Sequence, residues 1–118
     1  MRKSIASIAL IRREAESQTL WLARWDEGWK SYRFVGGHKK DGESFRECLI
    51  RGIAEKLGLK EGRDVFVASA PLENMTYTDV SRSTGEPTEY ITELFDVALT
   101  DAATQSAIDA NPANRTIR

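Results

Sequence analysis

The sequence has one cysteine and no long hydrophobic run. The single Cys48 excludes an intrachain disulfide and a cysteine-based metal cluster, and we expect it to be a small buried hydrophobe in a reducing compartment. The apolar stretch at residues 4–11 is short and continues into charged residues without a cleavage-like end. A buried strand therefore explains it better than a signal peptide. No membrane-spanning segment is predicted, and the expected location is the cytoplasm.

The sequence also lacks an excess of either charge, with 17 Lys and Arg against 18 Asp and Glu. Sequence-independent binding to polyanions needs clustered positive charge. The balance therefore predicts neither bulk nucleic-acid binding nor attraction to anionic membranes. The 41% of hydrophobic and 30% of charged residues are typical of a globular protein, and the length predicts a single domain over residues 1–118.

Strand patterns lie before and after a central segment of the chain. The first segment is continuously aliphatic, which predicts a strand covered on both faces. Other segments alternate apolar and polar residues or are rich in β-branched and aromatic residues. The predicted strands are residues 4–11, 19–25, 32–35, 64–70, 75–80 and 90–99, with a polar turn at 14–18. A short helix is predicted at 100–110, capped by Thr100 or Asp101.

One longer helix is predicted between these strands. Apolar residues recur every three or four positions from residue 45 to residue 57, which is the period of an amphipathic helix. Ser44 and Glu47 form a capping-box pattern at its start, and Gly58 stands where a helix ends on a left-handed residue. The order of elements predicts an α/β sandwich.

The segment at residues 37–59 reads GHKKDGESFRECLIRGIAEKLGL and resembles a Nudix box. The family signature is a Gly, five residues, a Glu, seven residues, Arg-Glu, an aliphatic residue, any residue, Glu-Glu, any residue, a Gly and an aliphatic residue. Seven of its nine fixed positions are matched, by Gly37, Glu43, Arg51, Ile53, Glu55, Gly58 and Leu59. A match of this length is far more specific than a lone glycine motif.

The resemblance implies a Nudix-like α/β/α sandwich with a mixed β-sheet, apparently short at the C-terminus. It implies hydrolysis of a nucleoside diphosphate linked to another group, with Mg²⁺ or Mn²⁺ as cofactor and a nucleotide-like small molecule as partner. By resemblance, Glu55 is a catalytic residue and a metal ligand, with Glu47 as a second ligand. Glu43 and Arg51 are also counted among the catalytic residues by resemblance, although fixing the loop against the helix suits them best. Gly37 would let backbone approach the phosphates.

Two acidic positions of the signature are occupied by Gly52 and Lys56. In the family pattern, three Glu side chains at helical positions i, i+3 and i+4 meet at one site. Here their formal charge changes from minus three to zero, because Lys56 offsets the remaining Glu55. Lys56 would repel a divalent cation. Gly52 stands at the position of the usual general base and has no side chain, although it also leaves room for a neighbouring side chain or ligand backbone. We therefore expect weakened catalysis.

Several of these residues have a second interpretation. Glu47, Arg51 and Glu55 at four-residue spacings also match a salt-bridge ladder, and Glu47 also matches a helix cap. Lys56 either binds a phosphate in place of the metal's charge or is a solvated charge. His38 either binds the substrate or belongs to a solvated, lysine-rich turn.

Further candidates lie outside the box. Trp21, Trp25 and Trp29 either stack on a nucleobase or pack in a core or interface. Late in the chain, where the family often has an extra metal-binding or base-like Glu, a solvated face is the default interpretation of the acids Glu86, Glu89, Glu93 and Asp96. Of these, Glu89 and Glu93 are expected on one face of a strand.

The sequence leaves two classes of function open. One is a weakened Nudix-type pyrophosphohydrolase. The alternative is a catalytically silent module on the same fold that binds a nucleotide ligand or another protein. Family members commonly continue into another strand and a longer helix, so an apolar sheet face is expected to find a partner, with a homodimer as the obvious candidate.

Overall fold

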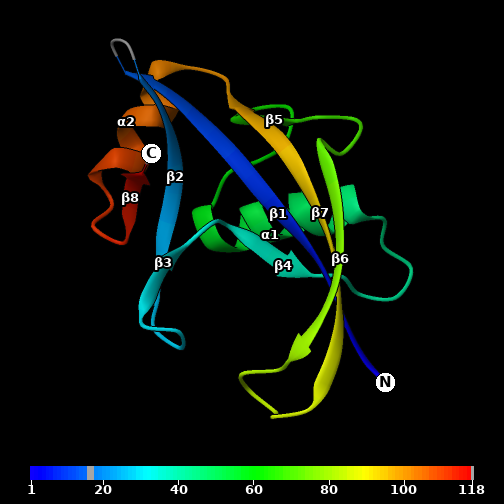
Figure 1. The fold of residues 1–118 in the computed structure, drawn as a ribbon. Helices are drawn as coiled ribbons and strands as arrows, with labels where there is room; N and C mark the ends of the chain where they lie inside the picture. Colours follow the sequence, from blue (N-terminus) through cyan, green and yellow to red (C-terminus); the bar gives the residue numbers. More distant parts are fainter. Residues whose placement is uncertain (16–17, 118) are drawn as a thin grey trace.

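The computed structural model describes residues 1–15 and 18–117, in which eight strands form one mixed sheet and two helices pack beside it (Figure 1). The strands are β1 (Arg2–Ala15), β2 (Gln18–Asp26), β3 (Ser31–Arg33), β4 (Gly36–His38), β5 (Val65–Val67), β6 (Glu73–Val80), β7 (Pro87–Leu99) and β8 (Asn114–Ile117). The helices are α1 (Phe45–Leu57) and α2 (Ala102–Ala110).

Strand β1 is the central element of the sheet. It pairs in parallel with β7 over residues 2–11, and antiparallel with β4 over residues 6–8 and with β2 over residues 12–15. The sheet order is β3-β2-β1-β7-β5, with β6 also on β7 and β8 also on β2. The strand predicted at residues 4–11 is thus confirmed, and it is longer at both ends because neighbouring strands pair with it along its whole length.

The core lies between the sheet and α1. Along β1, Ser7, Ala9 and Ile11 are buried, and the Ser7 hydroxyl donates to the Phe45 carbonyl at the start of α1 over 2.6 Å. This places the odd-numbered side of β1 against the helix, as alternation along a strand requires. The α1 face that meets it carries Cys48, Leu49, Gly52 and Ile53, all buried. The predicted amphipathic helix is therefore confirmed in position and in orientation.

The opposite face of the sheet is only partly covered. Ile8 and Leu10 are half-buried, and on neighbouring β6 the side chains of Met75 and Tyr77 are 42% and 49% exposed. The first strand is thus buried over residues 7–11 on its odd-numbered side and half-buried at Ile8 and Leu10 on the other, so that its full cover on both faces stays a prediction. Self-association through the face stays a prediction.

Three segments differ from the sequence-based expectations. Residues 36–38 form the short strand β4, where a loop was expected, because their backbone pairs with β1. Strand β8 was not predicted, and it pairs with β2. Strand β5 is shorter than expected, while β2, β6 and β7 agree within a few residues. The predicted turn at 14–18 lies partly at residues 16–17, outside the described residues.

The expected mixed-sheet α/β sandwich is confirmed, with α1 behind β1 and β7 and with α2 and β8 together beside β2 (Figure 1). Asp101 caps α2 by accepting from the Thr104 backbone N–H over 2.8 Å, which decides between the two predicted caps. Neither helix in the described part of the chain is both long and apolar enough to cross a membrane. The organisation as one domain over residues 1–118 stays a prediction.

Candidate functional site

Helix α1 begins and ends where the sequence predicts. The Ser44 hydroxyl accepts from the Glu47 backbone N–H over 3.0 Å, and a Glu47 carboxylate oxygen accepts from the Ser44 N–H over 2.9 Å. At the other end, Gly58 adopts the left-handed conformation with φ of 69° and donates to the Ala54 carbonyl. Glu47 is therefore a capping residue, and its role as a metal ligand stays a prediction.

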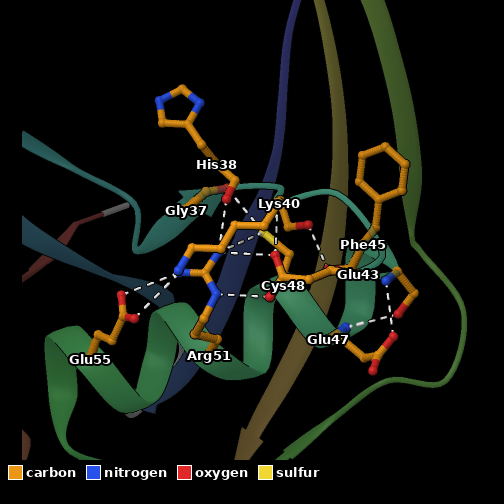
Figure 2. A network of polar contacts seen from close by, with 11 residues as sticks. Gly37, His38, Lys40, Glu43, Phe45, Glu47, Cys48, Arg51 and Glu55 are labelled. Atoms are coloured by element: carbon orange, nitrogen blue, oxygen red, sulfur yellow. Dashed lines mark hydrogen bonds and ion pairs between the residues drawn. The ribbon is translucent and has the colours of Figure 1, made fainter.

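Arg51 holds the β4–α1 loop on the helix. Its guanidinium donates two parallel bonds to Glu43, from Nε over 2.8 Å and from Nη2 over 3.1 Å, and a further bond to the His38 carbonyl over 2.8 Å (Figure 2). Glu43 also accepts from the Lys40 backbone N–H over 2.8 Å. These contacts lower the pKa of Glu43 to about 2, with the Arg51 bond as the larger cause. The same bond raises the pKa of Arg51. Both side chains serve the loop scaffold.

Glu55 lies on the exposed side of α1. Its side chain is 59% exposed, and its carboxylate accepts from Arg51 Nη1 over 3.3 Å and 3.4 Å (Figure 2). The predicted salt-bridge ladder is thus half formed, because Arg51 pairs with Glu55 while Glu47 bonds the helix start. Glu55 still has carboxylate oxygen lone pairs to offer a ligand.

Gly52 lies where α1 packs closely on β4. A Cβ added at Gly52 would lie 3.3 Å from the Gly36 carbonyl oxygen and 3.7 Å from the Gly37 nitrogen. Only a residue without a side chain therefore fits here without displacing backbone. Gly52 was expected to leave room for a neighbouring side chain or a ligand backbone, and the group that lies against it is neither. The neighbour is the backbone of this chain.

Lys56, one helical turn after Gly52, reaches the same backbone. Its Nζ donates a hydrogen bond to the carbonyl of Gly36. Positions i and i+4 share one face of a helix, so the two departures from the signature meet at one carbonyl group. The pair of glycines at 36–37, opposite a glycine on the helix, was the sequence signal for this close approach, but the sequence did not identify the lysine's partner.

The other predicted site residues lie around this contact. Gly37 accepts from the Cys48 thiol over 3.3 Å, and Cys48 is fully buried, as expected. His38 is exposed, and Figure 2 shows its ring directed away from Arg51. The structure thus brings the backbone of Gly37 and His38 to the helix face, whereas the imidazole points elsewhere.

The residues present do not fit a standard magnesium site. Mg²⁺ prefers carboxylate oxygens in octahedral arrangement. Yet the described residues contain no group of three or more His, Cys, Asp and Glu side chains able to hold a metal ion. Glu43 is bonded to Arg51, and Glu47 and Glu55 lie eight residues apart on α1, or about 12 Å along its axis. Lys56 adds a positive charge at the Gly36 carbonyl.

The acids of β7 lie on two faces. Asp96 pairs with Arg12 over 3.5 Å, and Glu89 pairs with Lys3 over 3.8 Å. Glu93 is half-buried and lies opposite Ser7 on β1, which in turn lies opposite Gly37 on β4. Glu93 is thus the β7 acid in line with the box loop. A separate hollow near 600 Å³, lined by residues that include Phe66, Asp96 and Gln105, takes in one of the late acids, Asp96, and none of the box residues.

The three tryptophans lie on the β2–β3 hairpin. Trp21 is half-buried, with the guanidinium carbon of Arg12 5.7 Å from its ring centroid, whereas Trp25 and Trp29 are at the surface. Trp25 packs edge-on against Tyr32, with centroids 5.3 Å apart.

The Trp29 ring has the guanidinium carbons of Arg33 and Arg82 at 4.5 Å and 4.6 Å from its centroid. Since Arg82 belongs to the turn between β6 and β7, this contact joins two hairpins. Trp25 and Trp29 are both more than a third exposed, so base stacking by them stays a prediction.

Comparison with known proteins was made on sequence and on structure. The family model described as the NUDIX domain matches residues 1–113. No curated protein matches the sequence significantly. The Ap4A hydrolase of C. elegans superposes with a TM-score of 0.64 at 14% identity, covering 100% of this chain and 81% of its own.

Two structures of NrtR from Shewanella oneidensis are also similar. One, described as NrtR, superposes with a TM-score of 0.64 at 17% identity, covering 97% of this chain and 51% of its own. Its NUDIX domain complexed with ADP ribose superposes with a TM-score of 0.61 at 14% identity, covering 86% of this chain and 63% of its own. At identities this low, the structural similarity shows the fold alone, and the predicted Nudix-like α/β/α sandwich is confirmed.

Proposed function

The chain belongs to the Nudix family, and we propose that it binds a nucleoside diphosphate linked to another group and hydrolyses it only weakly. The ligand class is supported by the family and by a similar domain complexed with ADP ribose. The weak hydrolysis is supported by the helix face on which the family signature has its three Glu residues. We further propose that the protein works in the cytoplasm.

One observation carries the proposal. The Gly36 carbonyl lies against Gly52 and accepts from Lys56, so protein groups already occupy the space beside two of the three signature positions. A divalent ion there would meet one carboxylate, Glu55, and one ammonium. Like charges a few ångströms apart repel by several kcal/mol in a partly shielded site. The repulsion by the Lys56 ammonium therefore offsets the attraction by Glu55, and binding of a divalent ion is disfavoured.

The direct test is a turnover assay with Mg²⁺ and with Mn²⁺. The panel contains dinucleoside polyphosphates, nucleotide sugars, ADP-ribose and nucleoside triphosphates, and an active Nudix hydrolase is assayed in parallel. We expect binding of at least one diphosphate compound, with turnover orders of magnitude below that of the active enzyme. Rapid turnover that Glu55→Gln abolishes would contradict the proposal, since it would mean that the remaining acid completes a working site.

A second candidate is a hydrolase with a displaced acid, and the position of Glu93 favours it. This half-buried side chain lies two strands from Gly37, or about 10 Å across the sheet, and no bond or ion pair involves it among the described contacts. Measurable turnover that Glu93→Gln removes, while Glu86→Gln in the neighbouring turn does not, would support this alternative. If Glu93→Gln and Glu86→Gln turn the substrate over at the same rate, the displaced-acid hydrolase is contradicted.

A further inference from the structure

The two departures from the signature act as one unit. We propose that the Lys56 ammonium takes the place of a bound divalent cation, so that the diphosphate group binds without metal and Mg²⁺ weakens its binding. The inference rests on the proposed function, because it concerns the same ligand. It adds the direction in which Mg²⁺ changes the affinity for the ligand. Mg²⁺ weakens binding here, whereas a metal-dependent pyrophosphohydrolase needs the metal.

The first step is the approach of β4 to α1. Gly36 and Gly52 are both buried, and a Cβ on Gly52 would lie 3.3 Å from the Gly36 oxygen. A side chain at position 52 would therefore push the strand outward. With glycine there, the Gly36 carbonyl lies against the helix, within reach of the residue one turn later.

The second step is the position of the ammonium. Lys56 Nζ donates to the Gly36 carbonyl, while the residue as a whole remains exposed. A lysine ammonium has three N–H donors, and one is used here. The two others remain for phosphate oxygens, and the carbonyl bond fixes the direction from which they are offered. A long lysine side chain is otherwise free to move, so this bond reduces the entropy lost when a ligand binds.

The third step is the charge around Lys56. Arg51, the basic residue of α1 nearest to Lys56 in the sequence, is already bonded to Glu43 and Glu55. Residues 37–59 contain five Lys and Arg and four Asp and Glu, so the segment carries a net charge of +1. Glu at both 52 and 56 would make it −2, and a diphosphate would then need a metal ion to approach. Here it does not.

The effect of Mg²⁺ follows from the same charges. A diphosphate that carries Mg²⁺ has lost most of its negative charge and brings a cation towards Lys56, which repels it. Free Mg²⁺ and Lys56 therefore compete for the same phosphate oxygens. Excess Mg²⁺ should lower the affinity of the protein for the ligand.

The experiment is calorimetry of ADP-ribose binding to the full chain, once with EDTA and once with excess Mg²⁺. We expect binding with EDTA and a several-fold weaker affinity with Mg²⁺. Lys56→Met should weaken binding by about tenfold or more, the scale of a lost charged hydrogen bond. Lys60→Met is the matched control, because it removes the same charge from an exposed position just after the helix and should leave the affinity nearly unchanged.

The outcomes separate the inference from the proposed function. Binding that requires Mg²⁺ would overturn the inference and leave the proposed ligand class standing. Equal losses of affinity in Lys56→Met and Lys60→Met would also overturn the inference. The overall positive charge of the region, and not the position of Lys56, would then explain the binding. If no diphosphate compound binds with or without metal, the proposed function itself is wrong. Should Lys56→Met fail to fold, the metal dependence of the unmodified chain still decides.

Discussion

Arg51 and Glu43 are joined by two parallel bonds of 2.8 Å and 3.1 Å that close the β4–α1 loop onto the helix. This is the bidentate geometry in which arginine binds carboxylates most strongly. Because Arg51 also bonds the His38 carbonyl, one side chain fixes both ends of the loop. The scaffold of the box is therefore complete, although its acidic face is not.

The Glu43 carboxylate should make the fold sensitive to acid. Its pKa in the folded chain is about 2, below the ordinary value of 4.5, so the ionised form stabilises the fold above pH 4.5 and this contribution is lost as the pH falls towards 2. In Glu43→Gln, the loss of stability between about pH 6 and about pH 3 should be smaller than in the unmodified chain. Urea denaturation at both pH values measures it. Glu27→Gln, whose side chain is 76% exposed, is the control and should not change the difference.

The capping box should contribute measurably to stability. Ser44→Ala removes the acceptor of the Glu47 N–H, and the loss of a Ser cap typically costs about 1 kcal/mol of unfolding free energy. Urea denaturation at neutral pH measures the change. Ser69→Ala, at an exposed position outside the helices and strands, should have almost no effect. Equal effects of the two substitutions would be evidence against the cap.

Gly52→Ala should destabilise the fold although alanine favours helices. The replacement adds about 1 kcal/mol of helix propensity, but its Cβ would lie 3.3 Å from the Gly36 oxygen. Overpacking against backbone costs more than this gain, so we expect a net loss of about 1 kcal/mol in unfolding free energy. Ser106→Ala, on the exposed side of α2, should instead be neutral or slightly stabilising. A gain in stability for Gly52→Ala would mean that α1 and β4 are not in close contact.

The two hairpins should be coupled through Trp29. A double-mutant cycle with Trp29→Leu and Arg82→Met should give a coupling energy of about 0.5 kcal/mol, the scale of an exposed cation–π contact. The same cycle with Trp25→Leu in place of Trp29→Leu should give a value near zero, because Trp25 packs on Tyr32 instead. Equal coupling in both cycles would indicate a general change in the β2–β3 hairpin.

Local signals in the sequence predicted the helix well. The cap at Ser44, the end at Gly58 and the pairing of Arg51 with Glu55 all depend on residues a few positions apart, so spacing alone is informative. The extent of β1 was underestimated, because its last residues are polar and are held by pairing with β2. Strand β4 was missed for a related reason, since two glycines carry no strand signal of their own.

The distant contacts of the site were beyond prediction from one sequence. Lys56 and Gly36 are 20 residues apart, and their bond depends on how closely a helix packs on a strand. Trp29 and Arg82 are farther apart still, in turns of different hairpins. In both cases the residue types indicated chemistry, but only the fold supplies the partner.

The contact at the Gly36 carbonyl also bears on how the domain can change by mutation. A first step that replaces Gly52 by Glu would force its side chain against the backbone of β4. A first step that replaces Lys56 by Glu would put a carboxylate beside the carbonyl oxygen that the lysine now bonds. Each single step is unfavourable even if the two together restore an acidic face. This is sign epistasis, and it makes the present pair a local optimum from which the acidic face of the family signature is not easily reached by single substitutions.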